Sequence, residues 1–150
     1  MRIPPVVMLA ASAAASRRLA ASDASARATP ALRLAGLSLG AVGTAVALAG
    51  VAAFRQHRTT VDPRYPERAS TLVDGGVYAW TRNPMYVGLV AVAAGWAVAH
   101  GSVRAAAGPA VLLAYLDRVQ IAAEERALRD RFGPAYDLYA RRVCRWLGRR

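Results

Sequence analysis

Long, nearly uncharged apolar segments constrain the fold of this chain more than any other feature. The first runs from Leu32 to Phe54 and is interrupted only by Arg33 near its start. Two shorter segments, Pro84 to Ala99 and Val103 to Val119, carry charges only near their ends. A bilayer core of roughly 30 Å needs about 20 apolar residues per helix. These lengths predict an all-α, polytopic membrane helix bundle with three to four transmembrane helices; a soluble all-α bundle is the alternative.

The composition and the charge of the chain agree with a membrane protein. Of its 150 residues, 55% are hydrophobic and 19% are charged, whereas a typical soluble domain has about 25% charged residues. All basic residues are Arg, and the net charge of +11 would also suit nucleic acid. Because the arginines flank the apolar segments without a basic–aromatic pattern, we predict a lipid bilayer with anionic headgroups as the partner, and no nucleic acid.

The chain is predicted to form one domain with four parts. These are N-terminal helices, a cytoplasmic loop, a helical hairpin and a cytoplasmic helical C-terminal tail, at residues 1–54, 55–83, 84–119 and 120–150. The hairpin turns at His100-Gly101-Ser102. The opening apolar run, Ile3 to Ala15, is short for a span. We favour a tilted first membrane helix there over the core of a cleaved signal peptide.

The distribution of arginine predicts the orientation. With four spans, the 55–83 loop and the tail lie on the side of Arg2, which then holds fifteen Arg against five on the other side. Arginine-rich loops stay in the cytoplasm, so we predict an inner or plasma membrane protein whose active site and C-terminus face the cytoplasm. A single cysteine, Cys144, excludes an internal disulfide. His57 and His100 fall on opposite faces, so no metal site is predicted.

The polar residues form a motif that the apolar hairpin splits into two halves. The first half runs from Tyr78 to Gly88, and the second is Glu124-Glu125 followed by Phe132-Gly133-Pro134-Ala135-Tyr136. Thirty-seven residues separate Tyr86 from Glu124, enough for two membrane crossings and a tight turn. The two halves are therefore expected to meet at one membrane face and to form a site.

The first half of the motif predicts the start of a helix. Asn is a favoured N-cap residue, and Pro is favoured at the first helical position, so Asn83-Pro84 opens the hairpin. A helix N-terminus presents unpaired N–H groups that suit an anionic group. Arg82 beside it adds a bidentate donor for a carboxylate or a phosphate.

The acidic residues of the second half lie on the apolar side of the predicted helix, whereas a solvated acidic face would lie opposite it. When residues 120–132 are drawn as a helix, Glu124 and Glu125 lie beside an apolar stripe that includes Ile121 and Leu128. Inward carboxylates at a membrane interface are costly unless they meet a cation or hydroxyls. We expect at least one of them to face a site; an i,i+4 surface pair between Glu125 and Arg129 is the alternative.

At these residues the chain resembles the isoprenylcysteine carboxyl methyltransferase family, which belongs with the phospholipid N-methyltransferases. The family pattern is Gly-x-Tyr, Arg-His-Pro-x-Tyr-x-Gly, a hydrophobic hairpin, Glu-Glu and Phe-Gly-x-x-Tyr. Here it reads Gly76-Val77-Tyr78, Arg82-Asn83-Pro84-Met85-Tyr86-Val87-Gly88, Glu124-Glu125 and Phe132-Gly133-Pro134-Ala135-Tyr136. Asn83 stands where the family usually has His, so a proton-transfer role at that position is in doubt.

The resemblance implies methyl transfer from S-adenosylmethionine to a lipidic or small hydrophobic acceptor, as in protein-S-isoprenylcysteine O-methyltransferase. It implies catalytic roles for Arg82 and Asn83. It also implies cofactor contacts from Tyr78, Arg82, Asn83, Pro84, Tyr86, Gly88, Glu124 and Glu125. Two alternatives remain open: a membrane reductase with a nicotinamide cofactor, which shares a similar Arg-His-Pro-x-Tyr pattern, and a non-enzymatic membrane scaffold.

Overall fold

The computed structural model describes residues 3–56 and 72–149, and its regular elements there are all helices, as the sequence predicts. In chain order they are α1 (Pro5–Ala21), α2 (Pro30–Gln56), η2 (Gly76–Ala79), α3 (Pro84–Ala99), η3 (Arg104–Ala106), α4 (Ala107–Tyr115), η4 (Leu116–Ile121), α5 (Ala122–Phe132) and α6 (Pro134–Arg142). Among these, α1, α2, α3 and α6 each begin at a proline, because proline has the φ angle of the first helical residue and lacks the N–H that would be unpaired there. His57 and most of the predicted 55–83 loop lie outside the described residues.

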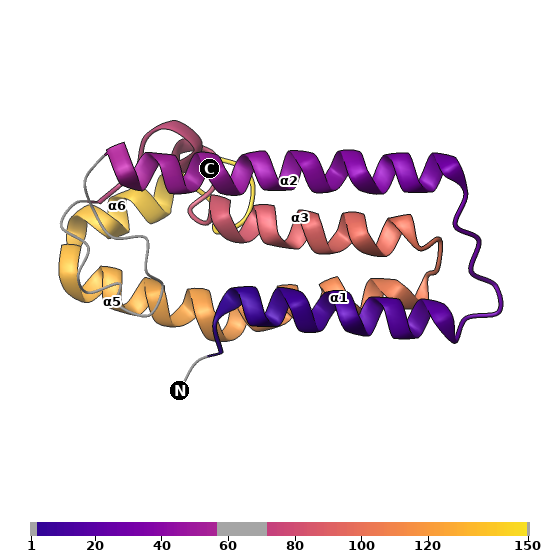
Figure 1. The fold of residues 1–150 in the computed structure, drawn as a ribbon. Coiled ribbons are helices and arrows are strands. Elements are labelled where there is room, and N and C mark those ends of the chain that lie inside the picture. The colour runs from indigo at the N-terminus through magenta and orange to yellow at the C-terminus, as the bar shows by residue number, and fades with distance from the viewer. Residues whose placement is uncertain (1–2, 57–71, 150) are drawn as a thin grey trace.

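The helices pass four times along the long axis of the molecule (Figure 1). Helices α1, α2 and α3 make the first three passes, and the fourth is the unbroken run of α4, the π-helical η4 and α5. The turn between the third and the fourth pass falls at His100 and Gly101, as predicted. We call the end that holds η2, the start of α3, α5 and α6 the motif end, and the end that holds residues 22–29 and 100–103 the far end.

Glycines bring α2 and α3 into close antiparallel contact. A Cβ added to Gly88 would collide with the carbonyl oxygen of Gly43, and one added to Gly95 would collide with that of Gly36. Small residues at such crossings let two backbones approach, which is how helices associate in lipid. Because α2 lies along α3 (Figure 1), the start of α3 is held in a defined place at the motif end.

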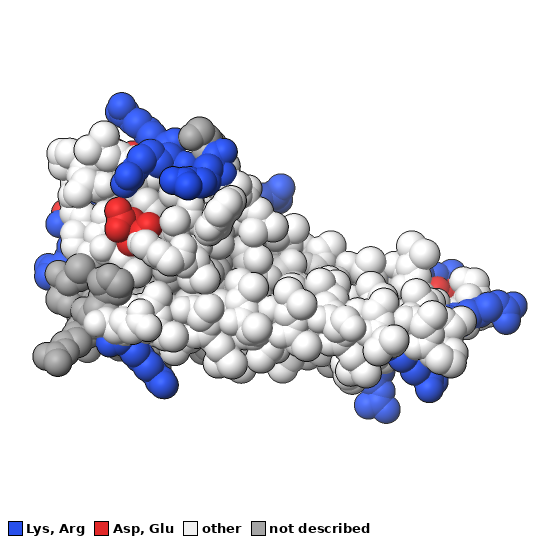
Figure 2. All heavy atoms as spheres, turned by 90° about the horizontal axis from the view of Figure 1, so that it is seen from above, with Lys and Arg blue, Asp and Glu red and all other residues white. Residues whose placement is uncertain are grey.

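Helix α2 confirms that the segment from Leu32 to Phe54 can cross a membrane. It has 27 residues and is long and apolar enough to span, whereas Pro84–Ala99 is a shorter apolar helix. Leu34 and Leu37 of α2 are 68% and 70% exposed. In Figure 2 the charged residues gather at the two ends of the molecule, with an uncharged belt between them. The count of three to four spans stays a prediction.

The opening apolar run belongs to α1, which is part of the bundle. Helix α1 continues through Arg17 to Ala21 and packs against α4 and η3. Ser16 is fully buried, and its hydroxyl donates a hydrogen bond of 2.8 Å to the carbonyl of Ala105. The contact uses a small polar side chain at a close helix crossing, which is typical of helix association in membranes.

The predicted helical tail is wrong beyond α6. Helix α6 ends at Arg142, and Val143 is extended, with φ −121° and ψ 132°. The segment 143–149, which we call the C-terminal segment, folds back on the loop before α3. The N–H of Arg82 donates to the carbonyl of Cys144 at 3.0 Å, and the N–H of Gly148 donates to the carbonyl of Trp80 at 2.9 Å. These bonds take the place of the helical ones.

Candidate functional site

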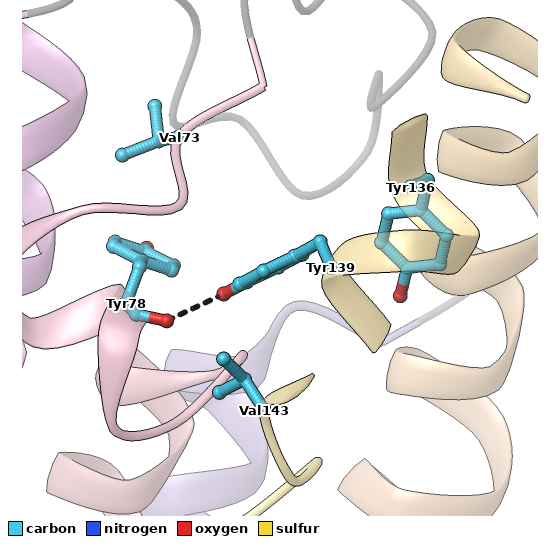
Figure 3. Packing of buried hydrophobic residues seen from close by; sticks show 5 residues of the cluster. All are labelled: Val73, Tyr78, Tyr136, Tyr139 and Val143. Atoms are coloured by element: carbon cyan, nitrogen blue, oxygen red, sulfur yellow. Dashed lines mark hydrogen bonds between the residues drawn. The ribbon is translucent and has the colours of Figure 1, made fainter. Parts of the chain in front are cut away.

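An aromatic cluster joins η2 to α6 at the motif end. Tyr78, Tyr136 and Tyr139 are buried together with Val73 and Val143 (Figure 3). The hydroxyl of Tyr139 donates a hydrogen bond of 2.8 Å to the carbonyl of Tyr78. Burial raises the pKa of Tyr136 to about 12 and that of Tyr78 still further.

The two halves of the split motif meet through Glu124. The hydroxyl of Tyr86, near the start of α3, donates a hydrogen bond of 2.5 Å to Oε1 of Glu124 on α5. Gln120 in η4 donates to the same oxygen at 2.6 Å. A π-helical turn such as η4 is rare and occurs often at functional sites. Here it places a buried amide next to a carboxylate of the motif.

Glu125 is buried and is held by two arginines. Its side chain accepts a hydrogen bond from Nη2 of Arg145 at 2.6 Å and one from Nε of the same residue at 3.1 Å. Nη2 of Arg82 lies 3.1 Å from the Oε1 atom. With the residue only 6% exposed, these cations are what makes burial of the carboxylate tolerable. The prediction of an inward glutamate is confirmed, and both cations come from outside its own helix.

Arg145 also binds a second carboxylate, and sequence reasoning missed it. Its Nη1 donates to Asp117 of η4 at 3.1 Å, and Nε1 of Trp146 donates to the same carboxylate at 2.9 Å. The hydrogen bond to Glu125 raises the pKa of the Arg145 guanidinium above its ordinary value. Arg145 and Glu125 are 20 positions apart in the chain, so no local sequence motif predicts their contact.

The Asn83 side chain does not cap α3 as predicted. Asn83 occupies the N-cap position, and Pro84 is the first helical residue, but the cap has no side-chain hydrogen bond. The amide Nδ2 donates instead to the carbonyl of Arg145 at 2.8 Å. The Thr81 hydroxyl donates to the same carbonyl at 3.3 Å. The Asn83 side chain thus hydrogen-bonds to a residue 62 positions away, whereas the N-cap preference predicts a bond to the first turn of the helix.

A small cavity of about 70 Å³ lies between the two halves of the motif. Its walls include six predicted site residues: Tyr78, Arg82, Asn83, Tyr86, Glu124 and Glu125. The other walls are Phe54, Leu72, Val73, Met85, Leu128, Tyr136 and Tyr139. Two further predicted residues lie outside this lining and face α2: a Cβ on Gly88 would meet Gly43, and Pro84 lies against Gly50.

Two buried polar atoms in the cavity walls have no hydrogen-bond partner. They are the hydroxyl of Tyr78 and Nε of Arg82. An unpaired buried donor costs about 1–3 kcal/mol, so such atoms call for an explanation. Both donors line the cavity and suit a polar, partly anionic ligand. Within residues 3–56 and 72–149, no group of three or more His, Cys, Asp or Glu is placed to hold a metal ion.

Comparison with known families agrees with this architecture. The sequence profile of the phospholipid methyltransferase family matches residues 32–135, from the start of α2 to the start of α6. The chain belongs to the phospholipid methyltransferase family. Membership in this family indicates a membrane methyltransferase, and the methyl donor of such enzymes is in general S-adenosylmethionine. The family relation expected from the split motif is thereby confirmed.

A further comparison found a short relative of this phospholipid methyltransferase family member. An uncharacterized protein from Haemophilus influenzae is 33% identical over 63 residues, which cover 42% of this chain and 100% of that protein. No solved structure is significantly similar to the chain. The family match ends at residue 135, so Arg145 and the rest of the C-terminal segment lie beyond it.

Proposed function

We propose that the chain transfers a methyl group from S-adenosylmethionine to a lipidic or small hydrophobic acceptor at the cytoplasmic face of a membrane. The observation that carries the proposal is the pair of unpartnered buried donors, the Tyr78 hydroxyl and Arg82 Nε. They lie in a cavity that both halves of the motif enclose. The chemistry of this lining fits a ligand with a carboxylate, hydroxyls and a cationic centre.

The polar side chains of the cavity suit the different parts of S-adenosylmethionine. When bound, this cofactor supplies an electrophilic methyl group on a sulfonium. Arg82, beside the start of α3, suits the carboxylate. Glu124 or Glu125 suits the ribose hydroxyls or the amino group. The rings of Tyr78 and Tyr86 suit the adenine or the cationic sulfur.

The cavity must widen to admit a molecule of this size. Its volume of about 70 Å³ holds a few water molecules, whereas ligands of drug size occupy pockets of roughly 300–1,000 Å³. Helix α6 forms one wall and has only nine residues. It follows Gly133, whose φ of 51° and ψ of −127° are open only to glycine. We assign the widening to an outward movement of α6 about Gly133.

An apolar groove supports a hydrophobic acceptor. The groove, of about 760 Å³, runs along α3 and α4 and is lined by Leu39, Val87, Val90, Ala91, Ala94, Ala110, Leu113, Ala114, Asp117, Arg118, Trp146 and Leu147. Its apolar lining comes from α2, α3 and α4, which we take as membrane-spanning, so an acceptor enters it laterally from the bilayer. Its charged and aromatic residues lie toward the motif end and suit the polar group of the acceptor.

The lining of the cavity favours an acceptor that is already nucleophilic. Among the described residues that line it there is no histidine, and both glutamates are engaged with hydrogen-bond donors. A carboxylate or a thiolate needs no general base, whereas an ammonium group must first lose a proton. Catalysis then comes from orientation and from exclusion of water. This preference agrees with the resemblance to the isoprenylcysteine enzymes.

The proposal includes a membrane topology. Helices α1, α2 and α3 and residues 103–119 are taken as four spans, with the motif end in the cytoplasm. The uncharged belt in Figure 2 supports this arrangement, and the arginine count of fifteen against five gives its direction. Cysteine accessibility at exposed positions of both ends tests it: label that reaches the motif end from outside intact cells would contradict it.

Binding of S-adenosylmethionine to the purified protein in detergent tests the function. We expect Arg82→Ala to lose most of the affinity and Tyr78→Phe to lose part of it, because each removes a donor that lines the cavity. Arg126→Ala is the matched control, since Arg126 is exposed next to Glu125. Binding of NADPH in place of S-adenosylmethionine would indicate the reductase, and binding of neither would indicate the scaffold. Transfer of a labelled methyl group to membrane lipids or prenylated thiols then identifies the acceptor.

A further inference from the structure

We propose that Arg145 is a positioning residue that fixes the carboxylate of Glu125 in the orientation that cofactor binding requires. The inference rests on the proposed function, because it takes Glu125 as a cofactor contact. It extends the site to the C-terminal segment, which lies beyond the family match and outside the split motif. Arg145 does not line the cavity itself, so it acts through Glu125.

The guanidinium of Arg145 determines where both oxygens of Glu125 lie. Nε donates to Oε1 at 3.1 Å and Nη2 donates to Oε2 at 2.6 Å. A guanidinium is planar, so two parallel bonds set the plane of the carboxylate as well as its distance. The contact of Arg82 reaches Oε1 alone, at 3.1 Å. Without Arg145 the buried carboxylate would keep a cation on one side only.

The backbone of Arg145 is held in turn by the first half of the motif. Its carbonyl accepts hydrogen bonds from the Asn83 amide at 2.8 Å and from the Thr81 hydroxyl at 3.3 Å. The bond from the Arg82 N–H to Cys144 supports the same stretch of chain. The first half of the motif thus fixes the C-terminal segment through hydrogen bonds to its backbone. That segment in turn binds Glu125, which belongs to the second half of the motif.

This arrangement gives Asn83 a role that needs no change of charge. The carbonyl of Arg145 requires only an N–H donor, and an amide supplies one as a histidine ring does. Asn83 therefore supplies the hydrogen bond that holds Arg145 beside Glu125, although it stands where the pattern Arg-His-Pro-x-Tyr has His. Its contribution is to position Arg145, and proton transfer is not required of it.

Arg145 also lies between the cavity and the apolar groove. On one side it binds Glu125, which lines the cavity, and on the other Nη1 donates to Asp117, which lines the groove, at 3.1 Å. Trp146, next in the chain, donates to the same carboxylate at 2.9 Å. Arg145 therefore lies behind both linings and links a carboxylate of the cavity to a carboxylate of the groove.

A set of matched variants tests the role through the affinity for S-adenosylmethionine, measured by calorimetry on the full chain in detergent. Arg145→Ala is expected to weaken binding about tenfold to a hundredfold, the range for hydrogen bonds to a charged group. Arg145→Lys keeps the charge and loses the planar fork, so it should restore part of the affinity. Arg142→Ala, in the exposed pair with Asp74 at 3.4 Å, is the control and should stay within about twofold.

A double-mutant cycle with Glu125→Gln separates positioning from direct contact. If Arg145 acts through Glu125, Arg145→Ala changes affinity little in the Glu125→Gln background. An equal loss in both backgrounds would overturn the proposal, and so would wild-type affinity in Arg145→Ala or in Arg145→Lys. Asp117→Asn removes the other partner of Arg145 and should keep the affinity within about threefold. If the wild-type chain does not bind S-adenosylmethionine, the proposed function fails, and the role of Arg145 fails with it.

Discussion

The two ends of the bundle each hold a largely buried carboxylate that ties distant segments together, yet they are built differently. At the far end, Asp23 accepts hydrogen bonds from the hydroxyls of Ser25 and Ser102 at 2.6 and 2.5 Å. At the motif end, Glu125 is bound by the cations Arg82 and Arg145. Asp23 and Glu125 are 9% and 6% exposed, so burial does not distinguish them.

The difference lies in what remains around each carboxylate. Asp23 is satisfied by neutral donors, and a backbone bond from Arg27 to Gly101, at 2.9 Å, closes the same loop. Those contacts join residues 22–29 to the turn after α3, and the carboxylate of Asp23 makes one of them. Around Glu125 there is a cavity with two unpartnered buried donors. A structural carboxylate accepts its hydrogen bonds from groups of the protein around it, whereas a candidate binding site retains buried donors that have no partner.

The sharpest way to break this comparison is to remove each carboxylate. We expect Glu125→Ala to abolish measurable binding of S-adenosylmethionine and to lower the free energy of unfolding by about 3–5 kcal/mol, because two cations lose a buried partner. Asp23→Ala should leave the affinity unchanged. Calorimetry and thermal unfolding in detergent measure both quantities. Equal losses of affinity in the two variants would show that both ends serve only stability.

The close contact between α2 and α3, which run between the two ends, depends on their glycines. In Gly88→Leu the new side chain meets the backbone of Gly43, so the helices must separate, at a cost of about 1–3 kcal/mol. The start of α3 then shifts, and cofactor affinity falls with stability. Gly40→Ala is the control, because a Cβ there meets open space. Unfolding midpoints that are equal for both variants would contradict the close crossing.

A single hydroxyl sharpens the comparison within the motif end. Tyr86→Phe removes the donor to Glu124, and we expect about tenfold weaker binding of S-adenosylmethionine, since bonds to charged groups contribute about 1.5–3 kcal/mol. Tyr115→Phe is a matched control, because its hydroxyl bonds to the backbone of Ile3 at 3.1 Å, away from the cavity. Calorimetric titration of both variants with S-adenosylmethionine measures the effect. An unchanged affinity in Tyr86→Phe would remove Glu124 from the proposed site.

The smallest effect is expected at the far end, and it depends on pH. Hydrogen bonds from Ser102 and then Ser25 lower the pKa of Asp23 from 3.8 to about 2. A lowered pKa stabilises the folded state above the unfolded pKa, and this contribution is lost as the pH falls from about 4 toward 2. The unfolding midpoint of Asp23→Asn should therefore lie below that of the wild type at pH 7 and converge with it near pH 2. A constant difference across this range would contradict the assignment.

Local patterns predicted much of the fold and part of the site. Uncharged segments of membrane length and prolines at helix starts located α2 and α3, because both signals act within a few residues of the chain. The helical repeat also predicted that at least one of Glu124 and Glu125 faces the interior, and Glu125 does. Local rules failed at Asn83, where a distant carbonyl competes successfully for the amide. They failed again beyond Arg142, where backbone bonds to the loop before α3 replace the expected helix.

The sequence by itself determined that the chain is helical, that its middle suits a bilayer and that its polar motif meets at one end. These properties follow from hydrophobicity, spacing and helix starts, which are local. Only the tertiary structure decided which cations meet Glu125, because Arg145 reaches it across 20 positions and is placed by bonds to a third segment. It also decided that Gly88 faces α2 instead of the cavity, since that depends on the close crossing of two helices.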